Sequence, residues 1–316
     1  MSARRSRAGS IIGTARLALL YSIVWPIASL LAYLPVGLGL AVGRRLGDLL
    51  WVLLPGRRAL TLANLERSFR SERSPAELRR LGRRSFEHLG MNLVESCCYF
   101  LRPTALMLAR VRVDGLIHLQ EAAARGSGIL VLTAHYGNWE LLAAAHGLTG
   151  LPLSFVVRPL DNPVLDELVD RFRLRTGAEM IAKRHALRGI LEALRRGRMV
   201  GILLDQNATR SEGVFVPFFG VPASTSKALA VIALRTGAPV VPVFLRREPG
   251  GRHCMDVRPP VAPPAGGDVG TFTASFNRAI EEEIRLAPEQ WFWMHARWRT
   301  RPREAAGDPR QASRSE

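Results

Sequence analysis

From residue 103 onward, short runs of branched apolar residues alternate with segments of helical periodicity, and this alternation limits the fold more than any other feature. Strands are predicted at residues 111–113, 129–132, 153–157, 199–204, 214–218, 240–245 and 254–258. Helices are predicted between them at residues 116–124, 139–148, 163–176, 186–196, 227–235 and 270–286. This order favours an α/β fold with a mostly parallel central sheet flanked by helices on both faces. Ligands of such sheets bind beyond the carboxyl ends of the strands.

The N-terminus differs from this pattern because it is basic and then strongly apolar. Four arginines precede an uncharged stretch at residues 17–43, which exceeds the roughly 20 apolar residues that a spanning helix needs. No small-residue cleavage site follows, so the stretch predicts an N-terminal hydrophobic membrane anchor that is not removed. A break near Pro35 is the alternative. Residues 36–54 would then lie along the membrane surface as an amphipathic helix, with Arg44, Arg45 and Asp48 on its polar side.

Two further helices are predicted between the anchor and the first strand, at residues 60–69 and 75–99. Ser74-Pro75-Ala76-Glu77 has the pattern of a capping box with proline at the first helical position. The expected organisation is therefore an anchor with an interfacial helix at residues 1–58, a globular domain at 59–302 and a disordered polar tail at 303–316.

Composition limits the partners and the compartment. The 316 residues carry a formal net charge of +17, which favours nucleic acid, a phospholipid surface or an acidic protein as a partner. Hydrophobic residues make up 47% of the chain, enough for a substantial core. Cys97, Cys98 and Cys254 do not form a disulfide framework, which fits a reducing compartment.

The clearest candidate for chemistry is the segment that follows the strand at residues 129–132. The strand ends shortly before His135, and Glu140 follows five positions later, on the first turn of the next predicted helix. Taken alone, a core histidine and a solvated glutamate are the more common interpretation. A neutral imidazole that a carboxylate holds in one tautomer can also remove a proton from an attacking hydroxyl. No G-x-S-x-G sequence supplies a nucleophile, so that hydroxyl would belong to the substrate.

Three other strand ends carry polar side chains. Arg158 follows the strand at 153–157 and suits phosphate or carboxylate recognition. Asp205, Gln206 and Asn207 follow the strand at 199–204, and Arg210 comes shortly after them. Ser224 or Thr225 is expected to cap the helix at 227–235, whose amino end would attract anions beside Lys227.

Together these segments resemble the glycerolipid acyltransferase superfamily, and most closely the late acyltransferases of lipid A biosynthesis. The resemblance rests on the His-x4-Glu block, Arg158-Pro-Leu-Asp-Asn-Pro163, Phe215-Val-Pro-Phe-Phe-Gly220 and the C-terminal run from Ala287 to Pro302. It covers residues 60–302. It implies a fold like that of glycerol-3-phosphate acyltransferase, and transfer of a fatty acyl chain from acyl carrier protein or coenzyme A to a hydroxyl of a lipid A precursor or related glycolipid.

On this resemblance His135 is the general base and Glu140 orients it. The residues expected to bind substrate are Asn138, Arg158, Asp205, Gln206, Arg210 and Lys227. A thioester is already activated, so no metal and no cofactor beyond the acyl donor are expected, and the histidines lack H-E-x-x-H spacing. The expected partners are a membrane lipid and an acidic acyl carrier protein. The expected location is the bacterial inner membrane, with the catalytic domain facing the cytoplasm.

Two other classes of function fit parts of the sequence. A membrane-bound binding protein with the same fold but no activity is possible, although it would not need both His135 and Glu140. Nucleic-acid binding rests only on the charge. The arginines are spread along the chain rather than clustered with aromatic residues, which argues against it.

Overall fold

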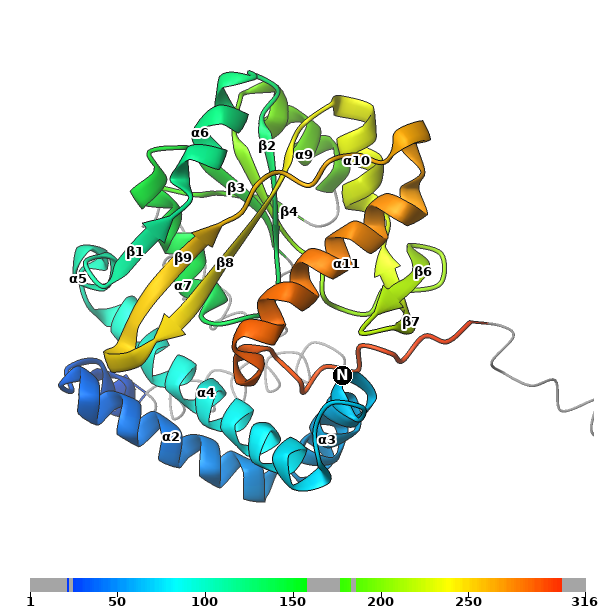
Figure 1. Ribbon diagram of the computed structural model, residues 1–316. Coiled ribbons are helices and arrows are strands. Elements are labelled where there is room, and N and C mark those ends of the chain that lie inside the picture. Colours follow the sequence, from blue (N-terminus) through cyan, green and yellow to red (C-terminus); the bar gives the residue numbers. More distant parts are fainter. Residues whose placement is uncertain (1–21, 23–24, 158–176, 183–185, 303–316) are drawn as a thin grey trace, which may run out of the picture.

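The structure is a computed structural model that describes residues 22, 25–157, 177–182 and 186–302. Its centre is a seven-stranded sheet in the order β1-β9-β8-β2-β5-β3-β4 (Figure 1). The strands are β1 (Val111–Asp114), β2 (Ile129–Thr133), β3 (Leu153–Val157), β4 (Glu179–Ala182), β5 (Met199–Leu203), β8 (Val240–Glu248) and β9 (Arg252–Val257). Strands β8, β2, β5, β3 and β4 are parallel, whereas β9 is antiparallel to β8. The predicted mostly parallel sheet is confirmed, although β4 was not predicted.

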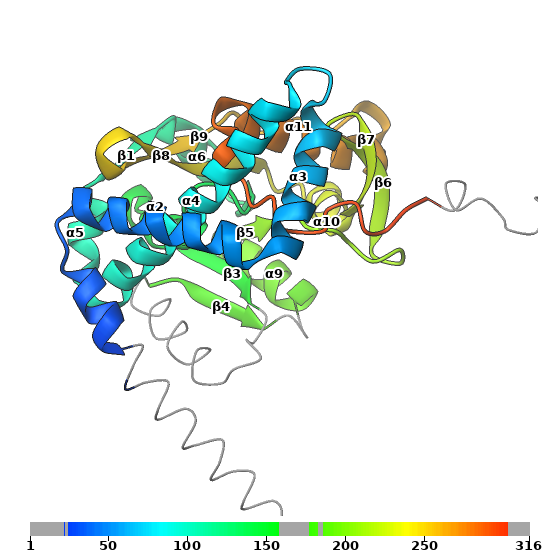
Figure 2. The ribbon, with the colours of Figure 1, turned by 90° about the horizontal axis from the view of Figure 1, so that it is seen from below.

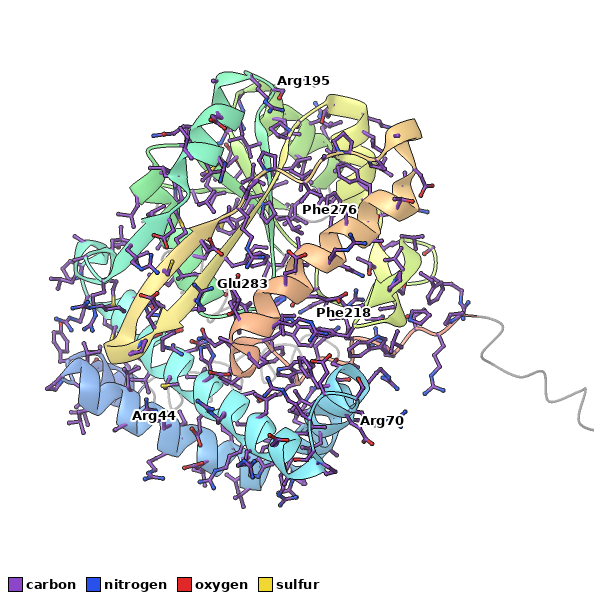
Figure 3. The ribbon with its side chains drawn as sticks, viewed as in Figure 1. Arg44, Arg70, Arg195, Phe218, Phe276 and Glu283 are labelled. Atoms are coloured by element: carbon purple, nitrogen blue, oxygen red, sulfur yellow. The ribbon has the colours of Figure 1, made fainter. Side chains whose placement is uncertain are left out.

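Helices cover both faces of the sheet because the central strands are apolar on both sides. Leu130 and Leu132 face one core with α9 (Ala186–Arg195), α10 (Ala228–Thr236) and α11 (Val269–Leu286). Ile129 and Val131 face the other core with α6 (Leu116–Ala124) and α7 (Trp139–Ala145). Figure 3 shows Phe218 and Phe276 within the first core, whereas Arg44, Arg70 and Arg195 lie on the periphery.

Most helices begin and end close to their predicted positions. The predicted helix at 139–148 divides into α7 and the 3₁₀ turn η1 (His146–Thr149). Short 3₁₀ turns also occur at η3 (Pro249–Gly251), η4 (Ala265–Gly267) and η5 (Pro288–Gln290). The predicted helix at 163–176 lies outside the described residues.

One prediction at the fourth polar segment is wrong. Ser224 and Thr225 do not cap a helix; they lie fully buried in β7 (Val221–Ser226), which pairs with β6 (Gly213–Phe218) as an antiparallel hairpin. The hairpin turn consists of Phe219 and Gly220, which both have positive φ, at 50° and 73°. The apolar Phe219 at a turn position hid this hairpin from the sequence pattern.

The N-terminal helices are α2 (Val36–Leu53), α3 (Pro55–Phe69), α4 (Pro75–Leu101) and α5 (Thr104–Leu108). The predicted capping box at Ser74 is confirmed, because the side chain of each of Ser74 and Glu77 accepts a hydrogen bond from the other's backbone N–H. Helix α2 lies along α4 on the outside of the molecule (Figure 2). Their backbones touch at Gly43, Gly47 and Gly90, where an added Cβ would lie 2.6 Å or less from a backbone atom of the other helix.

No helix among the residues that the structure describes is long and apolar enough to cross a bilayer. The predicted spanning anchor is therefore not supported by the described part of the chain. The uncharged stretch is interrupted at Pro35, and α2 begins at the next residue. The bounds of α2 agree with the alternative prediction, an amphipathic helix that begins at Val36.

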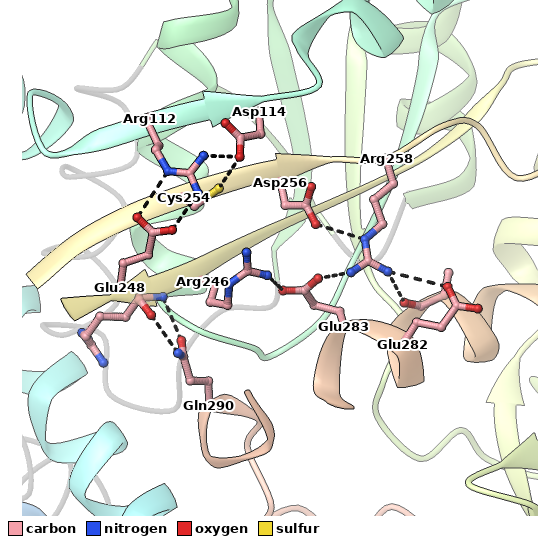
Figure 4. A network of polar contacts seen from close by, with 12 residues as sticks. Arg112, Asp114, Arg246, Glu248, Cys254, Asp256, Arg258, Glu282, Glu283 and Gln290 are labelled. Atoms are coloured by element: carbon pink, nitrogen blue, oxygen red, sulfur yellow. Dashed lines mark hydrogen bonds and ion pairs between the residues drawn. The ribbon is translucent and has the colours of Figure 1, made fainter. Parts of the chain in front are cut away.

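A network of ion pairs holds α11 against β8 and β9 (Figure 4). The Glu283 carboxylate is fully buried, accepts a hydrogen bond of 2.9 Å from Arg246 Nη1 and also pairs with Arg258. Arg258 in turn contacts Asp256 at 3.1 Å. Beyond α11, Gln290 makes two hydrogen bonds with the backbone of Arg247, at 2.8 and 2.9 Å. The network and these two bonds fix the path of the chain that follows, residues 291–301.

Candidate active site

His135 and Asp205 meet at the carboxyl end of the sheet because β2 and β5 are neighbours in register. Thr133 is paired with Leu203, so the residues two positions further along each strand lie side by side. His135 Nδ1 is 2.8 Å from Asp205 Oδ1, and the backbone N–H of His135 donates to Asp205 Oδ2 at 2.9 Å. Trp291 Nε1 donates to the same Oδ2 at 2.8 Å. Asp205 thus accepts three hydrogen bonds while only 2% exposed.

This arrangement fixes the tautomer of His135. A carboxylate only accepts hydrogen bonds, so Nδ1 of the neutral ring carries the proton and Nε2 has the free lone pair. The side-chain amide nitrogen of Gln206 lies 3.2 Å from that Nε2, and Gln206 is exposed. The His135 side chain is 22% exposed. A substrate hydroxyl can therefore reach Nε2 by taking the place of the Gln206 amide.

The surroundings tune His135 and Asp205 in opposite directions. Burial lowers the pKa of His135, but the charge and hydrogen bond of Asp205, with the charge of Glu140, outweigh it, so the pKa is raised above 6.5. Burial raises the pKa of Asp205, but His135 and the Trp291 indole outweigh it and the pKa is lowered. Asp205 is therefore ionised at neutral pH and stabilises the imidazolium that forms when His135 accepts a proton.

The turn after His135 is held in one conformation by its backbone. Gly137 has a φ of +58°, and a Cβ at this position would lie 1.7 Å from the carbonyl oxygen of Leu245, so only glycine fits. The N–H of Gly137 donates to Gln290 O at 2.9 Å, and that of Asn138 donates to Leu245 O at 3.2 Å. These contacts place the end of β2 against β8 and the start of residues 291–301.

A buried polar network supports the same turn from α4. Asn138 Nδ2 donates to Glu95 Oε2 at 2.6 Å and to the Tyr99 hydroxyl at 2.8 Å. Glu95 Oε2 also pairs with Arg247 Nη2 at 2.5 Å. The same Arg247 nitrogen donates to Asn92 Oδ1 at 2.6 Å, and Asn92 Nδ2 donates to the Gly137 carbonyl at 2.7 Å. Burial raises the pKa of Glu95, but Arg247 and His253 outweigh it and hold that pKa well below its usual range.

Residues 291–301 close the other side of the site. The backbone N–H of Phe292 donates to His135 O at 3.0 Å, and His295 Nε2 accepts from the backbone N–H of Asn207 at 3.0 Å. Arg297 is fully buried and donates to Ser224 O at 2.7 Å and to Thr225 Oγ1 at 2.6 Å. Burial lowers the pKa of Arg297 to about 10. This segment joins the turn after β5 to the hairpin β6–β7.

An apolar cavity of about 170 Å³ begins beside the His135 turn and lies between the sheet and helices α6 and α7. Thr133, Trp139 and Glu140 line it close to His135, and the Trp139 and His135 rings are 5.4 Å apart. Gly201 in the middle of β5 contributes space to the cavity because it has no side chain. The His135–Asp205 pair and the cavity are therefore adjacent.

The residues predicted from the sequence have different surroundings in the structure. Glu140 is on the first turn of α7 and lines the cavity, and the carboxylate hydrogen-bonded to His135 is that of Asp205. The side chain of Asn138, which was expected to bind substrate, is 2% exposed; it caps α7 through Leu141 N and bonds Glu95 and Tyr99.

The remaining predicted residues lie around or beyond this centre. Gln206 is at His135, as described above. Arg210 is exposed, donates to Arg301 O at 2.7 Å and lies over the Phe215 ring. Lys227 is exposed between β7 and α10, and no described contact joins it to His135. Arg158 lies outside the described residues.

Several residues at the site were not assigned a role from the sequence. Trp291, Phe292 and His295 contact Asp205, His135 and Asn207, and Glu95 and Arg247 support the turn. The dense run of aromatic and basic residues at 291–298 was the available signal for the first three. Glu95 and Arg247 are separated by 152 positions and gave no such signal. Within the described residues, no three His, Cys, Asp or Glu side chains gather as metal ligands; that the reaction needs no metal or cofactor stays a prediction.

The α/β fold thus gathers a histidine, a buried carboxylate and an apolar cavity at the carboxyl end of its sheet. The family model for bacterial lipid A biosynthesis acyltransferases matches residues 13–300. The lipid A biosynthesis lauroyltransferase of Escherichia coli is 33% identical over 275 residues, covering 86% of this chain and 89% of that protein. The palmitoleoyltransferase of the same organism is 31% identical over 265 residues, covering 83% and 85%. The chain therefore belongs to the bacterial lipid A biosynthesis acyltransferase family and is an O-acyltransferase.

A more distant relative is named for a different acceptor. The phosphatidylinositol mannoside acyltransferase of Mycobacterium tuberculosis is 29% identical over 205 residues, covering 62% of each chain. The family likeness thus extends to an enzyme named for another glycolipid.

Proposed function

We propose that this protein transfers a fatty acyl chain from an acyl thioester to a hydroxyl of a lipid A precursor, with His135 as general base. The observation that carries the proposal is the His135 imidazole beside an apolar cavity: Asp205 holds its Nδ1, and only the exposed Gln206 amide contacts its Nε2 lone pair among the described residues. The two Escherichia coli relatives, which are named for lipid A, support this acceptor.

In the proposed reaction the acceptor hydroxyl displaces the Gln206 amide and donates its proton to His135 Nε2. Its oxygen attacks the thioester carbonyl carbon, and a tetrahedral oxyanion forms. Asp205 stabilises the imidazolium at Nδ1. When the intermediate collapses, the carbon–sulfur bond breaks and the imidazolium returns its proton to the leaving thiolate. The products are the ester and the free thiol, and His135 is neutral again. The proton has passed from the hydroxyl to the thiolate, and no group is oxidised or reduced.

Glu140 has a supporting electrostatic role in this proposal. Its charge raises the pKa of His135, and its side chain lines the cavity near the reacting carbonyl. The predicted dyad of His135 and Glu140 is kept in this form: Asp205 orients the imidazole and Glu140 contributes to its basicity.

The donor is proposed to be an acyl carrier protein, which is acidic. Exposed arginines border residues 291–301: Arg57 donates to Met294 O at 3.1 Å, Arg67 lies over the Trp298 ring, and Arg210 bonds Arg301 O. Among the described residues, none of these three arginines has a carboxylate within 4.0 Å. Surface arginines without a carboxylate partner beside the site favour an anionic partner and speed its association.

Membrane association is proposed through the exposed side of α2. Leu38, Leu49, Val52 and Leu53 are each more than half exposed there, and the exposed Arg44 and Arg45 lie on the same helix. Exposed apolar side chains and arginines on one helix are typical of a helix that lies in the interface of an anionic membrane. This surface would bring the site to an insoluble acceptor at the inner membrane, with the domain in the cytoplasm.

The central test is acyl transfer by the purified full-length protein in detergent micelles. We expect transfer to a lipid A precursor from acyl carrier protein, with coenzyme A and a mannosylated inositol lipid as the alternative donor and acceptor arms. His135→Ala should lower the rate by about 10²–10⁴-fold, because a general base is lost. Near wild-type turnover by this variant would refute the mechanism. Background transfer with every donor and acceptor pair would instead favour a binding protein.

The membrane proposal is tested by flotation with vesicles containing anionic phospholipid. We expect Leu49→Asp combined with Val52→Asp to release the protein from the vesicles. Leu187→Asp is the matched control, because Leu187 is 56% exposed on α9, outside this surface. Equal flotation of both variants would show that α2 is not the contact.

A further inference from the structure

Four polar side chains interrupt the otherwise apolar lining of the cavity: Thr133, Glu140, His146 and Thr149. Glu140 and Thr149 are partly exposed, whereas Thr133 and His146 are buried. Most of the wall is aliphatic, with Val131, Leu142, Met199 and Val243 among its residues. Thr133 and His146 also line it, and their exposed fractions are only 6% and 7%. Polar side chains buried to this extent are normally hydrogen-bonded. If these two lack protein partners, a ligand in the cavity must supply them.

Thr133 has a hydroxyl without a protein partner. Its Oγ1 is buried and makes no hydrogen bond, while its backbone carbonyl accepts from Leu204 N at 3.1 Å within the sheet. Thr133 precedes His135 by two residues on β2, so its side chain lies at the end of the cavity nearest the reacting centre.

His146 presents an acceptor to the same space. Its Nδ1 lies 2.6 Å from Ala143 O, and a carbonyl only accepts, so Nδ1 carries the proton and Nε2 of the neutral ring has the lone pair. Burial lowers the pKa of His146, which favours this neutral form. No described residue donates a hydrogen bond to Nε2. His146 follows Glu140 by six residues, roughly 9 Å along a helix, and so lies farther from His135 than Thr133 does.

A plain alkyl chain in this cavity would cover both groups and leave them unpaired, which disfavours binding. A chain with a hydroxyl can instead donate to His146 Nε2, or exchange a hydrogen bond with Thr133 Oγ1 if the hydroxyl is near the carboxyl end. We propose that the cavity selects a hydroxylated fatty acyl chain, with Thr133 and His146 as its specificity-determining residues. This inference rests on the proposed acyl transfer and names the class of donor.

The test compares thioesters of one chain length on one carrier protein: unsubstituted, hydroxylated near the carboxyl end, and hydroxylated farther along the chain. Competing products formed by the full-length protein are quantified by mass spectrometry. We expect at least one hydroxylated chain to be preferred by about tenfold or more. Thr133→Val should remove a preference for the first hydroxyl position, and His146→Phe a preference for the second.

Thr61→Val is the matched control for Thr133→Val, because Thr61 is also buried with an unpartnered Oγ1 but lies on α3, outside the cavity. A preference for the unsubstituted chain, or a hydroxyl preference that both cavity variants retain, would overturn the inference.

Binding of the corresponding free fatty acids to the His135→Ala protein separates this inference from the proposed function. If transfer fails with every donor but hydroxylated acids still bind more tightly, the function is wrong and the selectivity of the cavity stands. If unsubstituted acids bind as tightly or more tightly, the selectivity is wrong whatever the activity.

Discussion

Two buried carboxylates support the turn after His135 from different sides, and they do different work. Asp205 is bonded to His135, whose other ring nitrogen faces the substrate side. Glu95 is enclosed by Arg247, Asn138 and Tyr99 and makes no described contact with His135. Both pKa values are lowered. A lowered carboxylate pKa is therefore common to both residues, and the contact with His135 is what distinguishes Asp205 from Glu95.

The largest expected difference between the two carboxylates is in catalysis. Asp205→Asn keeps the size of the side chain but removes the charge that stabilises the imidazolium. We expect kcat to fall by about 10²–10⁴-fold with little change in the free energy of unfolding. Steady-state transfer kinetics and denaturant unfolding measure the two quantities. An Asp205→Asn protein with wild-type kcat would show that Asp205 does not support the base.

Glu95→Gln should act mainly on stability. Removing the carboxylate charge leaves Arg247, whose side chain is 6% exposed, without a counter-charge, which costs about 3–5 kcal/mol for a buried ion pair. The free energy of unfolding from denaturant titration checks this value. Glu72→Gln is the control, because Glu72 pairs with Arg285 at 2.7 Å with both side chains exposed, and we expect a loss below about 1 kcal/mol. Equal losses in the two variants would contradict the assigned role of Glu95.

The smallest expected effect is a shift in the pH at which the rate changes, and it further distinguishes Asp205 from the other carboxylates. Only neutral His135 can accept a proton, and its pKa is raised above 6.5. The rate should therefore rise about tenfold per pH unit on the acid side and level off above that pKa. Glu72→Gln should leave the inflection unchanged, whereas Asp205→Asn should move it to lower pH because the neighbouring negative charge is lost. An inflection that does not move in Asp205→Asn would assign it to another group.

The sequence was a good guide to the fold because each central strand is a short apolar run between helices of clear periodicity. It also pointed to His135, shortly after such a run, and the structure has this residue hydrogen-bonded to Asp205; its role as a base stays a prediction. It did not identify Asp205 as the partner of His135, since that contact joins residues 70 positions apart and depends on the register of β2 and β5. Sequence spacing instead favoured Glu140, which is nearer in the chain and lies on α7.

The errors elsewhere have similar physical causes. Strand β7 was missed because Ser224 and Thr225 are polar yet fully buried, and their environment comes from Arg297 and Asn277 in distant parts of the chain. The support of the turn by Glu95 likewise needs α4, β8 and the His135 turn to be assembled. Local periodicity predicts helices and strands, whereas the partners of buried polar side chains depend on how those elements pack together.

The contact of α2 with α4 through Gly43, Gly47 and Gly90 has a consequence for how the chain can be shortened. Because backbone lies directly on backbone, no side-chain rearrangement can fill the space that α2 leaves. The exposed surface would include α4, the helix whose Asn92, Glu95 and Tyr99 hold the turn after His135. A truncated protein made for crystallisation should therefore begin before Val36; one that begins at residue 59 would lack part of the scaffold.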